Sequence, residues 1–295
     1  MMHWGGSRRL AVWLSLASVS FLTAGAPAGQ FEVGQRWVYE HQGPRPGVME
    51  PKVIDGQRIR QVLSVIEAEG QPRWIIEERF TNDPNATSLL YVNHERLLTA
   101  FKIEVDKGEA ATLTYDVAQP YQVPALAPGE EKTYETTLRM ASPKFAMPTT
   151  SVIKRLPDET ITTSAGEFAD CQHYLTKTKS TMNIKIVKIL VTDERDQWYH
   201  PSVNGLVKEV YRKDPIKFLA WSCEGYTATS VLTSFGIEAV AAARVSTARV
   251  DPNAPGAEPQ GNAPATAPFG GVTPWIVLVP IAIAAVFLLK RTRSK

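Results

Sequence analysis

The chain has 295 residues, of which 44% are hydrophobic and 21% charged, the composition of an ordinary globular protein able to bury a core. Its formal charge of +2 comes from its ends, because residues 1–28 and 272–295 hold six of the 32 basic residues and none of the 30 acidic ones. The stretch between them has 26 basic and 30 acidic residues, a net charge of −4. This mildly acidic balance argues against a nucleic-acid-binding surface.

Residues 1–28 have the three parts of a secretory signal peptide. A pair of arginines precedes an apolar stretch from Leu10 to Leu22, and small residues follow it. We predict cleavage between Ala28 and Gly29. An uncleaved anchor is the alternative, but the thirteen residues of this stretch span only about 20 Å as a helix, against roughly 30 Å of hydrocarbon.

Residues 29–245 are predicted to form one extracytoplasmic β-domain, because apolar and polar residues mostly alternate along them. Turn residues such as Pro128–Gly129 and Asn204–Gly205 separate the alternating runs at intervals of about ten residues. One short helix is expected near 237–244. The clearest runs are 58–67, 73–80, 97–105 and 183–191. This pattern predicts an all-β fold, a curved antiparallel sheet that forms a half-barrel, a barrel or a sandwich.

Alternation also predicts how the sheet is used. One face of each strand is apolar and is expected to pack inward, while the other carries Lys, Glu, Thr and Arg and is expected to meet water. A concave inner face has the chemistry to hold a lipid-like ligand. A core filled by side chains is the alternative.

The mature chain has two cysteines, Cys171 and Cys223, each within a predicted strand. An even number in an oxidising compartment predicts one disulfide, which stabilises by about 2–4 kcal/mol. Two buried thiols are the alternative. A redox pair is disfavoured because the chain has no CxxC spacing.

Local signatures of catalysis and metal binding are missing from the sequence. There is no GxSxG elbow, no paired-acid signature, no Gly-rich phosphate loop and no HExxH pair. The histidines that would have to supply metal ligands are scattered, at His41, His94, His173 and His200. We therefore predict neither metal, cofactor nor enzymatic activity. A hydrolase assembled from distant residues stays open.

The C-terminal part reads as a membrane tether. Residues 246–271 are dominated by Ala, Pro, Gly and Asn and are predicted to be a flexible stalk. Residues 272–289 carry no charge and would span about 27 Å as a helix, so they predict a transmembrane helix. The basic residues of 290–295 place this tail in the cytoplasm. The alternatives are a buried soluble helix and a sorting signal of the kind cut by rhomboid-type proteases.

Two stretches of the predicted β-domain read ETITTSAGEFADC, residues 159–171, and WYHPSVNGLVKEV, residues 198–210. A strand turns at a Gly-Xaa-Phe step in the first, and the second closes with Trp-Tyr and Gly-Leu-Val-Lys. This combination is similar to exported bacterial proteins of the domain of unknown function 3108 family. The residues that carry the match are Gly166, Phe168, Trp198, Tyr199, Gly205, Leu206, Val207 and Lys208. The glycines suit turns, and Phe168 and Val207 suit inward strand positions.

That resemblance implies a periplasmic β-domain and supplies no catalytic residues. Together with the two terminal signals, it predicts a single-pass protein of the bacterial inner membrane with its N-terminal domain in the periplasm. The predicted role is a binding or envelope-accessory module that engages a lipid-like ligand or a partner protein. A structural or interaction protein with a filled core is the alternative, and an envelope hydrolase is the third hypothesis.

Overall fold

The computed structural model describes residues 30–47, 53–104, 110–122, 124–141, 145–184, 187–218 and 221–240. Over these residues the chain is built from β-strands and one short 3-10 turn, which confirms the predicted all-β class. The predicted cleavage site at Ala28–Gly29, the stalk, the span and the basic tail lie outside the described residues. None of the described segments is a helix of the length and apolar character that crossing a membrane requires.

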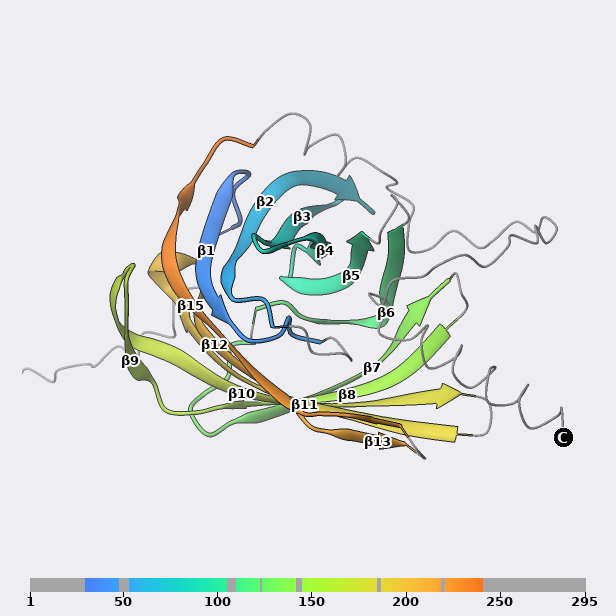
Figure 1. The fold of residues 1–295 in the computed structure, drawn as a ribbon. Coiled ribbons are helices and arrows are strands. Elements are labelled where there is room, and N and C mark those ends of the chain that lie inside the picture. Colours follow the sequence, from blue (N-terminus) through green and yellow to red (C-terminus); the bar gives the residue numbers. More distant parts are fainter. Residues whose placement is uncertain are drawn as a thin grey trace, which may run out of the picture.

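Antiparallel strands form one large sheet that closes on itself (Figure 1). Its order is β11-β12-β15-β1-β2-β3-β4-β5-β6-β7-β8-β10, and the pairing of β10 with β11 closes this ring of twelve strands. The structure thus selects the barrel among the three predicted sheet forms. The thirteenth strand, β9, pairs with β10 alone and lies beside β12 and β15.

The strands of the barrel are β1 (Gln35–Gln42), β2 (Gly56–Ala68), β3 (Gln71–Phe80), β4 (Asp83–Asn93), β5 (Leu97–Glu104), β6 (Ala110–Pro120), β7 (Glu131–Met140), β8 (Phe145–Arg155), β10 (Gly166–Ile184), β11 (Val187–His200), β12 (Gly205–Lys213) and β15 (Tyr226–Ile237). The remaining elements are β9 (Glu159–Thr163), the 3-10 turn η2 (Pro201–Val203) and a small hairpin of β13 (Ile216–Phe218) and β14 (Trp221–Cys223).

Most neighbouring strands are joined by short turns, so most of the sheet forms from contacts that are local in the sequence. The turn between β2 and β3 is typical, because Glu69 and Gly70 both have positive φ, at 55° and 73°, as a tight hairpin turn requires. Closure depends on distant pairing. The first strand, β1, lies between β2 and β15, so the two ends of the described domain pair with each other.

The predicted runs 58–67, 73–80 and 97–105 correspond to β2, β3 and β5. The run 183–191 was wrong as a single strand, because β10 ends at Ile184 and β11 begins at Val187, and these two residues pair. Alternation continues through this hairpin without glycine or proline, so the sequence carries no turn signal there. The helix expected near 237–244 is also not formed where the chain is described, since β15 continues to Ile237.

Many of the described side chains pack into the barrel interior. A large apolar cluster that includes Trp37 and Trp74 occupies one end, and a second that includes Leu113 and Met140 occupies the other, with β5 and β6 running between them. Burying each such side chain contributes roughly 1.5–3 kcal/mol. The interior also holds charged groups, and these define the candidate site.

Candidate functional site

A network of ion pairs crosses the inside of the barrel. Arg58 on β2 contacts Glu78 on β3 with 2.8 Å between Nη2 and Oε2, and it also pairs with Glu209 on β12. Since β1 and β15 separate β2 from β12 in the sheet, the pair of Arg58 and Glu209 reaches across the interior. Their side chains are only 3% and 1% exposed. Arg60 shares Glu78, with 2.6 Å between Nε and Oε2.

Both carboxylates of this network are held in the charged form. Burial favours the neutral acid of Glu209, but the neighbouring Arg58 and Arg195 outweigh it and lower the pKa of Glu209 to about 2. Burial acts in the same direction on Glu78, and Arg58 and Arg60 again outweigh it, so the pKa of Glu78 lies below its ordinary value. The interior is therefore ionic at neutral pH, with each buried charge offset by a partner.

This network corrects the expectation that the charged residues of each strand meet water. Arg58 and Glu209 are buried, and so they belong to the interior. A charge can be buried when the fold supplies an opposite charge. Here the partner lies on a strand that is distant in the sequence, which the pattern of one strand does not reveal. The sequence did contain one signal for this burial. Arg58, Arg60 and the apolar Val62 are spaced two residues apart, so their side chains point to the same face of β2.

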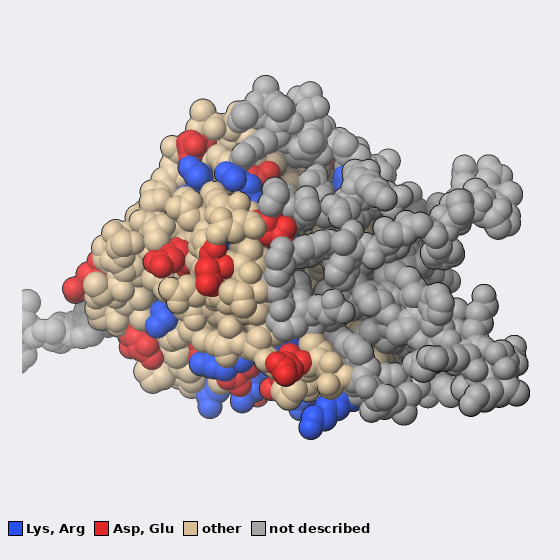
Figure 2. All heavy atoms as spheres, in the orientation of Figure 1, with Lys and Arg blue, Asp and Glu red and all other residues tan. Residues whose placement is uncertain are grey.

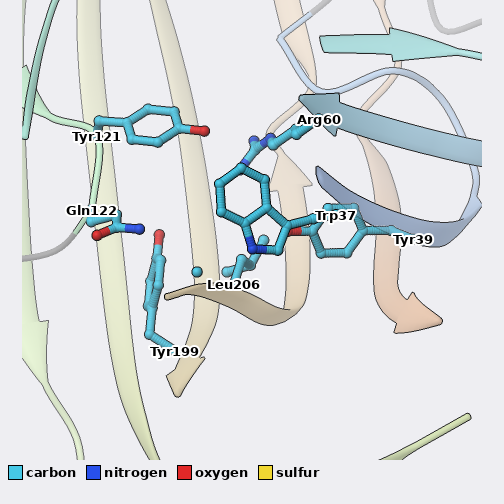
Figure 3. A pocket seen from close by; sticks show the side chains of 8 residues that line it. Trp37, Tyr39, Arg60, Tyr121, Gln122, Tyr199 and Leu206 are labelled. Atoms are coloured by element: carbon cyan, nitrogen blue, oxygen red, sulfur yellow. The ribbon is translucent and has the colours of Figure 1, made fainter. Parts of the chain in front are cut away.

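A small pocket lies beside the Arg60 end of this network (Figure 3). Its free space is about 10 Å³, roughly the room that one water molecule needs. In Figure 3 the hydroxyls of Tyr121 and Tyr199 and the amide of Gln122 point toward the space beside the Trp37 indole. The polar and aromatic side chains around it are Trp37, Tyr39, Arg60, Tyr121, Gln122 and Tyr199.

The rim of the pocket is fixed by hydrogen bonds. Trp37 Nε1 donates to the carbonyl of Val203 in η2 at 2.9 Å. Gln122 Nε2 donates to the carbonyl of Asn204 at 2.9 Å, while its Oε1 accepts from Arg96. The segment after β6 and the turn η2 thus close this end of the barrel over the pocket.

Three of the eight residues singled out by the family resemblance, Tyr199, Gly205 and Leu206, line this pocket. Gly205 has a different role from the predicted turn position. A Cβ on Gly205 would lie 2.6 Å from Trp37 Nε1, so a glycine is required for the indole to pack against the start of β12. The residues around the pocket that sequence reasoning missed are Tyr39, Arg60, Tyr121 and Gln122, because nothing local in the chain marks them.

The other five residues of that set lie elsewhere. Gly166 has a φ of +135° in the turn between β9 and β10, as predicted for a turn glycine. Phe168 packs its ring 5.5 Å from that of His200 and 6.2 Å from that of Phe235. Val207 is fully buried, and Lys208 Nζ lies 4.8 Å from the ring centre of Trp198. The structure therefore divides the motif between two places.

Trp198 belongs to a second polar network, centred on His173. The two rings stack with centres 4.3 Å apart. His173 Nδ1 lies 3.1 Å from Glu159 of β9, and Nε2 lies 3.0 Å from Asp196 of β11. Glu159 also accepts from Trp198 Nε1 at 3.0 Å. These contacts attach β9 to the barrel, which gives His173 and Trp198 a structural role.

The predicted disulfide is not formed, since Cys171 and Cys223 are separate buried thiols. The position of each cysteine can be given relative to β11. Cys171 lies beside Tyr199, because the next residue along β10 pairs with Tyr199. Cys223 interacts with Lys213, and Lys213 pairs with Asp193 of β11. Six residues of strand separate Asp193 from Tyr199, about 20 Å. A disulfide needs Cα atoms within about 7 Å. Cys171 therefore lies near the C-terminal end of β11 and Cys223 near its middle, too far apart to be bridged.

No group of three or more His, Cys, Asp or Glu within the described residues is placed to hold a metal ion. The envelope hydrolase required polar side chains gathered in an accessible pocket. The charges described inside the barrel are gathered but neutralise one another, and the space beside them admits about one water molecule.

On the surface, a groove of about 330 Å³ runs along the end of the barrel at η2. Two large apolar side chains of β15 line it while remaining exposed to solvent, Phe235 at 41% and Ile237 at 68%. Polar residues including Gln30, Gln35 and Asn204 lie around them. On the part of the surface that Figure 2 colours, acidic and basic side chains are interspersed.

No family model and no curated protein matches the chain, so the resemblance to the domain of unknown function 3108 family stays a prediction. Three solved structures are similar to it. A candidate lipoprotein from Parabacteroides distasonis has 13% identity and a TM-score of 0.36, covering 70% of this chain and 96% of its own. A candidate exported protein of Bacteroides fragilis with a YmcC-like fold has 12% identity and a TM-score of 0.34, with the same coverage.

The hypothetical lipoprotein YmcC of Escherichia coli has 12% identity and a TM-score of 0.33, covering 72% of this chain and 92% of its own. Similarity at this level supports no inference about the function of this chain.

Proposed function

We propose that this protein is an exported, membrane-tethered interaction module that binds a partner protein of the cell envelope through its surface. The observation that carries the proposal is the packing of described side chains inside the barrel. Apolar clusters occupy both ends of the barrel, an ion-pair network crosses it, and the pocket beside that network has room for about one water molecule. An acyl chain would need a cavity of several hundred Å³.

The groove at η2 is the surface that best fits a partner. Exposed apolar side chains gathered beside a groove and rimmed by polar groups are typical of protein interaction sites. Phe235 and Ile237 supply the apolar part, and Asn204 and Gln35 supply the rim. The secretory signal at 1–28 and the span at 272–289 support a location on the outer side of the inner membrane.

A photocrosslinking experiment in intact bacterial cells tests this proposal. A photoreactive residue at Ile237 of the full chain is expected to capture one reproducible envelope protein. The control position is Val117 on β6, which is apolar and 55% exposed but lies away from the groove, and it is expected to capture none. Adding Phe235→Ser is expected to reduce the Ile237 product.

Equal products from both positions, or an Ile237 product that Phe235→Ser leaves unchanged, would show that the groove is not the interaction site. The ligand alternative has its own readout. Lipid extraction and native mass spectrometry of the full-length protein are expected to find no stoichiometric lipid, and a bound lipid would replace this proposal by the lipid-carrier function.

Protease accessibility tests the orientation. Protease added to intact spheroplasts is expected to degrade residues 29–245 and to leave an epitope on the basic tail protected. A protected β-domain would contradict the proposed topology.

A further inference from the structure

The pocket beside Arg60 presents hydrogen-bond donors that donate to none of the described residues. The hydroxyls of Tyr39, Tyr121 and Tyr199 make no hydrogen bond with any described residue, although all three tyrosines line the same space. Tyr39 is 1% exposed and Tyr199 is 9% exposed. Buried polar groups are nearly always hydrogen-bonded, so an acceptor inside the pocket is expected.

The chemistry of these groups selects the kind of acceptor. Burial raises the pKa of each of the three tyrosines, so every hydroxyl keeps its proton at neutral pH. Burial acts against the charge on Arg60, but Glu78 outweighs it and the pKa of Arg60 lies above its ordinary value. The pocket therefore offers three O–H groups beside the permanent cation Arg60, whose Nε is paired with Glu78.

The other polar groups of the pocket are already engaged. The Trp37 indole N–H is bonded to Val203, and the Gln122 amide is bonded to Asn204 and Arg96. Gln122 thus serves as part of the rim. No carboxylate lines the space, because Glu78 meets Arg60 on the side of the ion-pair network. Donors converge here without a matching acceptor from the described residues.

We propose that this pocket is a binding site for one small monovalent anion, held by the hydroxyls of Tyr39, Tyr121 and Tyr199 beside the Arg60 guanidinium. The free space of about 10 Å³ limits the occupant to a halide or to the end of a small carboxylate such as formate. Sulfate and gluconate are too large. The pocket and the groove share Trp37, but the two proposals concern different occupants, so failure of either proposal leaves the other standing.

Anion titration of the purified full-length protein tests the proposal. Chloride or formate replaces gluconate at constant ionic strength, and thermal denaturation reports the midpoint. We expect the denaturation midpoint to rise and then saturate as the concentration of one of the two anions increases. If chloride is the occupant, the chloride NMR line is expected to broaden as well. A saturating effect of formate alone would assign the site to a carboxylate.

Variants locate the effect. Tyr121→Phe combined with Tyr199→Phe removes two hydroxyls and retains the rings, and it is expected to abolish the saturating response. The control is Tyr115→Phe, since Tyr115 packs in the other apolar cluster, away from the pocket, and this variant is expected to respond like wild type.

A wild-type midpoint indifferent to both anions would overturn the proposal and leave the pocket as a water site. An anion response that the Tyr121→Phe, Tyr199→Phe variant retains would overturn it as well. If the double variant does not fold, Tyr121→Phe alone replaces it, with a weaker saturating response as the expected result.

Discussion

At the scale of single residues, some positions inside the barrel are constrained by contact with one particular neighbouring side chain. Gly205 is fixed by the Trp37 indole that packs on its Cα, and Glu209 is fixed by the guanidinium of Arg58. Neither requirement concerns the secondary structure of the residue itself. Both residues lie on β12, and both neighbours lie on strands far from it in the sequence.

Gly205→Ala is expected to destabilise the protein by about 1–3 kcal/mol, because the added methyl group forces the indole of Trp37 to move. Gly236→Ala is the matched control, since nothing lies within 4 Å of a Cβ at that glycine. Chemical denaturation followed by tryptophan fluorescence measures both. Equal stability of the two variants would contradict the proposed packing role.

Glu209→Gln is expected to lower the free energy of unfolding by about 3–5 kcal/mol, because it removes one of the two carboxylates that offset Arg58 and leaves Glu78 shared between Arg58 and Arg60. Glu135→Gln, on the exposed surface of β7, is expected to change little. Thermal denaturation by circular dichroism gives the comparison. A loss below about 1 kcal/mol for Glu209→Gln would mean that the ion pair adds little to stability.

At the scale of elements, β9 is the one described strand of the large sheet that lies outside the closed ring, because it pairs only with β10. The Glu159 carboxylate is its main polar attachment, contacting both His173 and Trp198. Local opening of β9 therefore needs fewer broken contacts than opening of a barrel strand.

Glu159→Ala is expected to speed amide hydrogen exchange in residues 159–163 while leaving β2 and β3 protected. The free energy of unfolding of the whole domain is expected to fall by only about 1 kcal/mol, since the Glu159 side chain is 49% exposed and its ion pair is screened by solvent. Glu167→Ala, at an exposed position of the neighbouring strand, is the control. Unchanged exchange in β9 would show that backbone pairing alone holds it.

At the scale of the whole molecule, the barrel is held closed by pairing between the ends of the domain and by charges that meet across the interior. The carboxylates of Glu78 and Glu209 have pKa values below their ordinary value of 4.5. Their contribution to stability is present above the unfolded pKa and is lost as the pH falls toward the folded pKa, which is about 2 for Glu209. Asp193 opposes this in part, because burial raises its pKa.

The melting temperature is therefore expected to fall as the pH decreases from 4.5 toward 2. The decline is expected to be shallower for Glu209→Gln, which has no carboxylate to titrate at that position. Thermal melts across this range provide the measurement. An identical slope in the variant would assign the acid sensitivity to other groups.

The sequence by itself determined the all-β class and the positions of β2, β3 and β5, since alternation and turn residues act over a few neighbours. It also predicted a signal peptide and a membrane span, which lie outside the described residues. Tertiary structure alone decided that the sheet closes, that Arg58 and Glu209 lie inside it, and that Cys171 and Cys223 stay apart. Each of these depends on which distant strands become neighbours, and only the folded barrel establishes that.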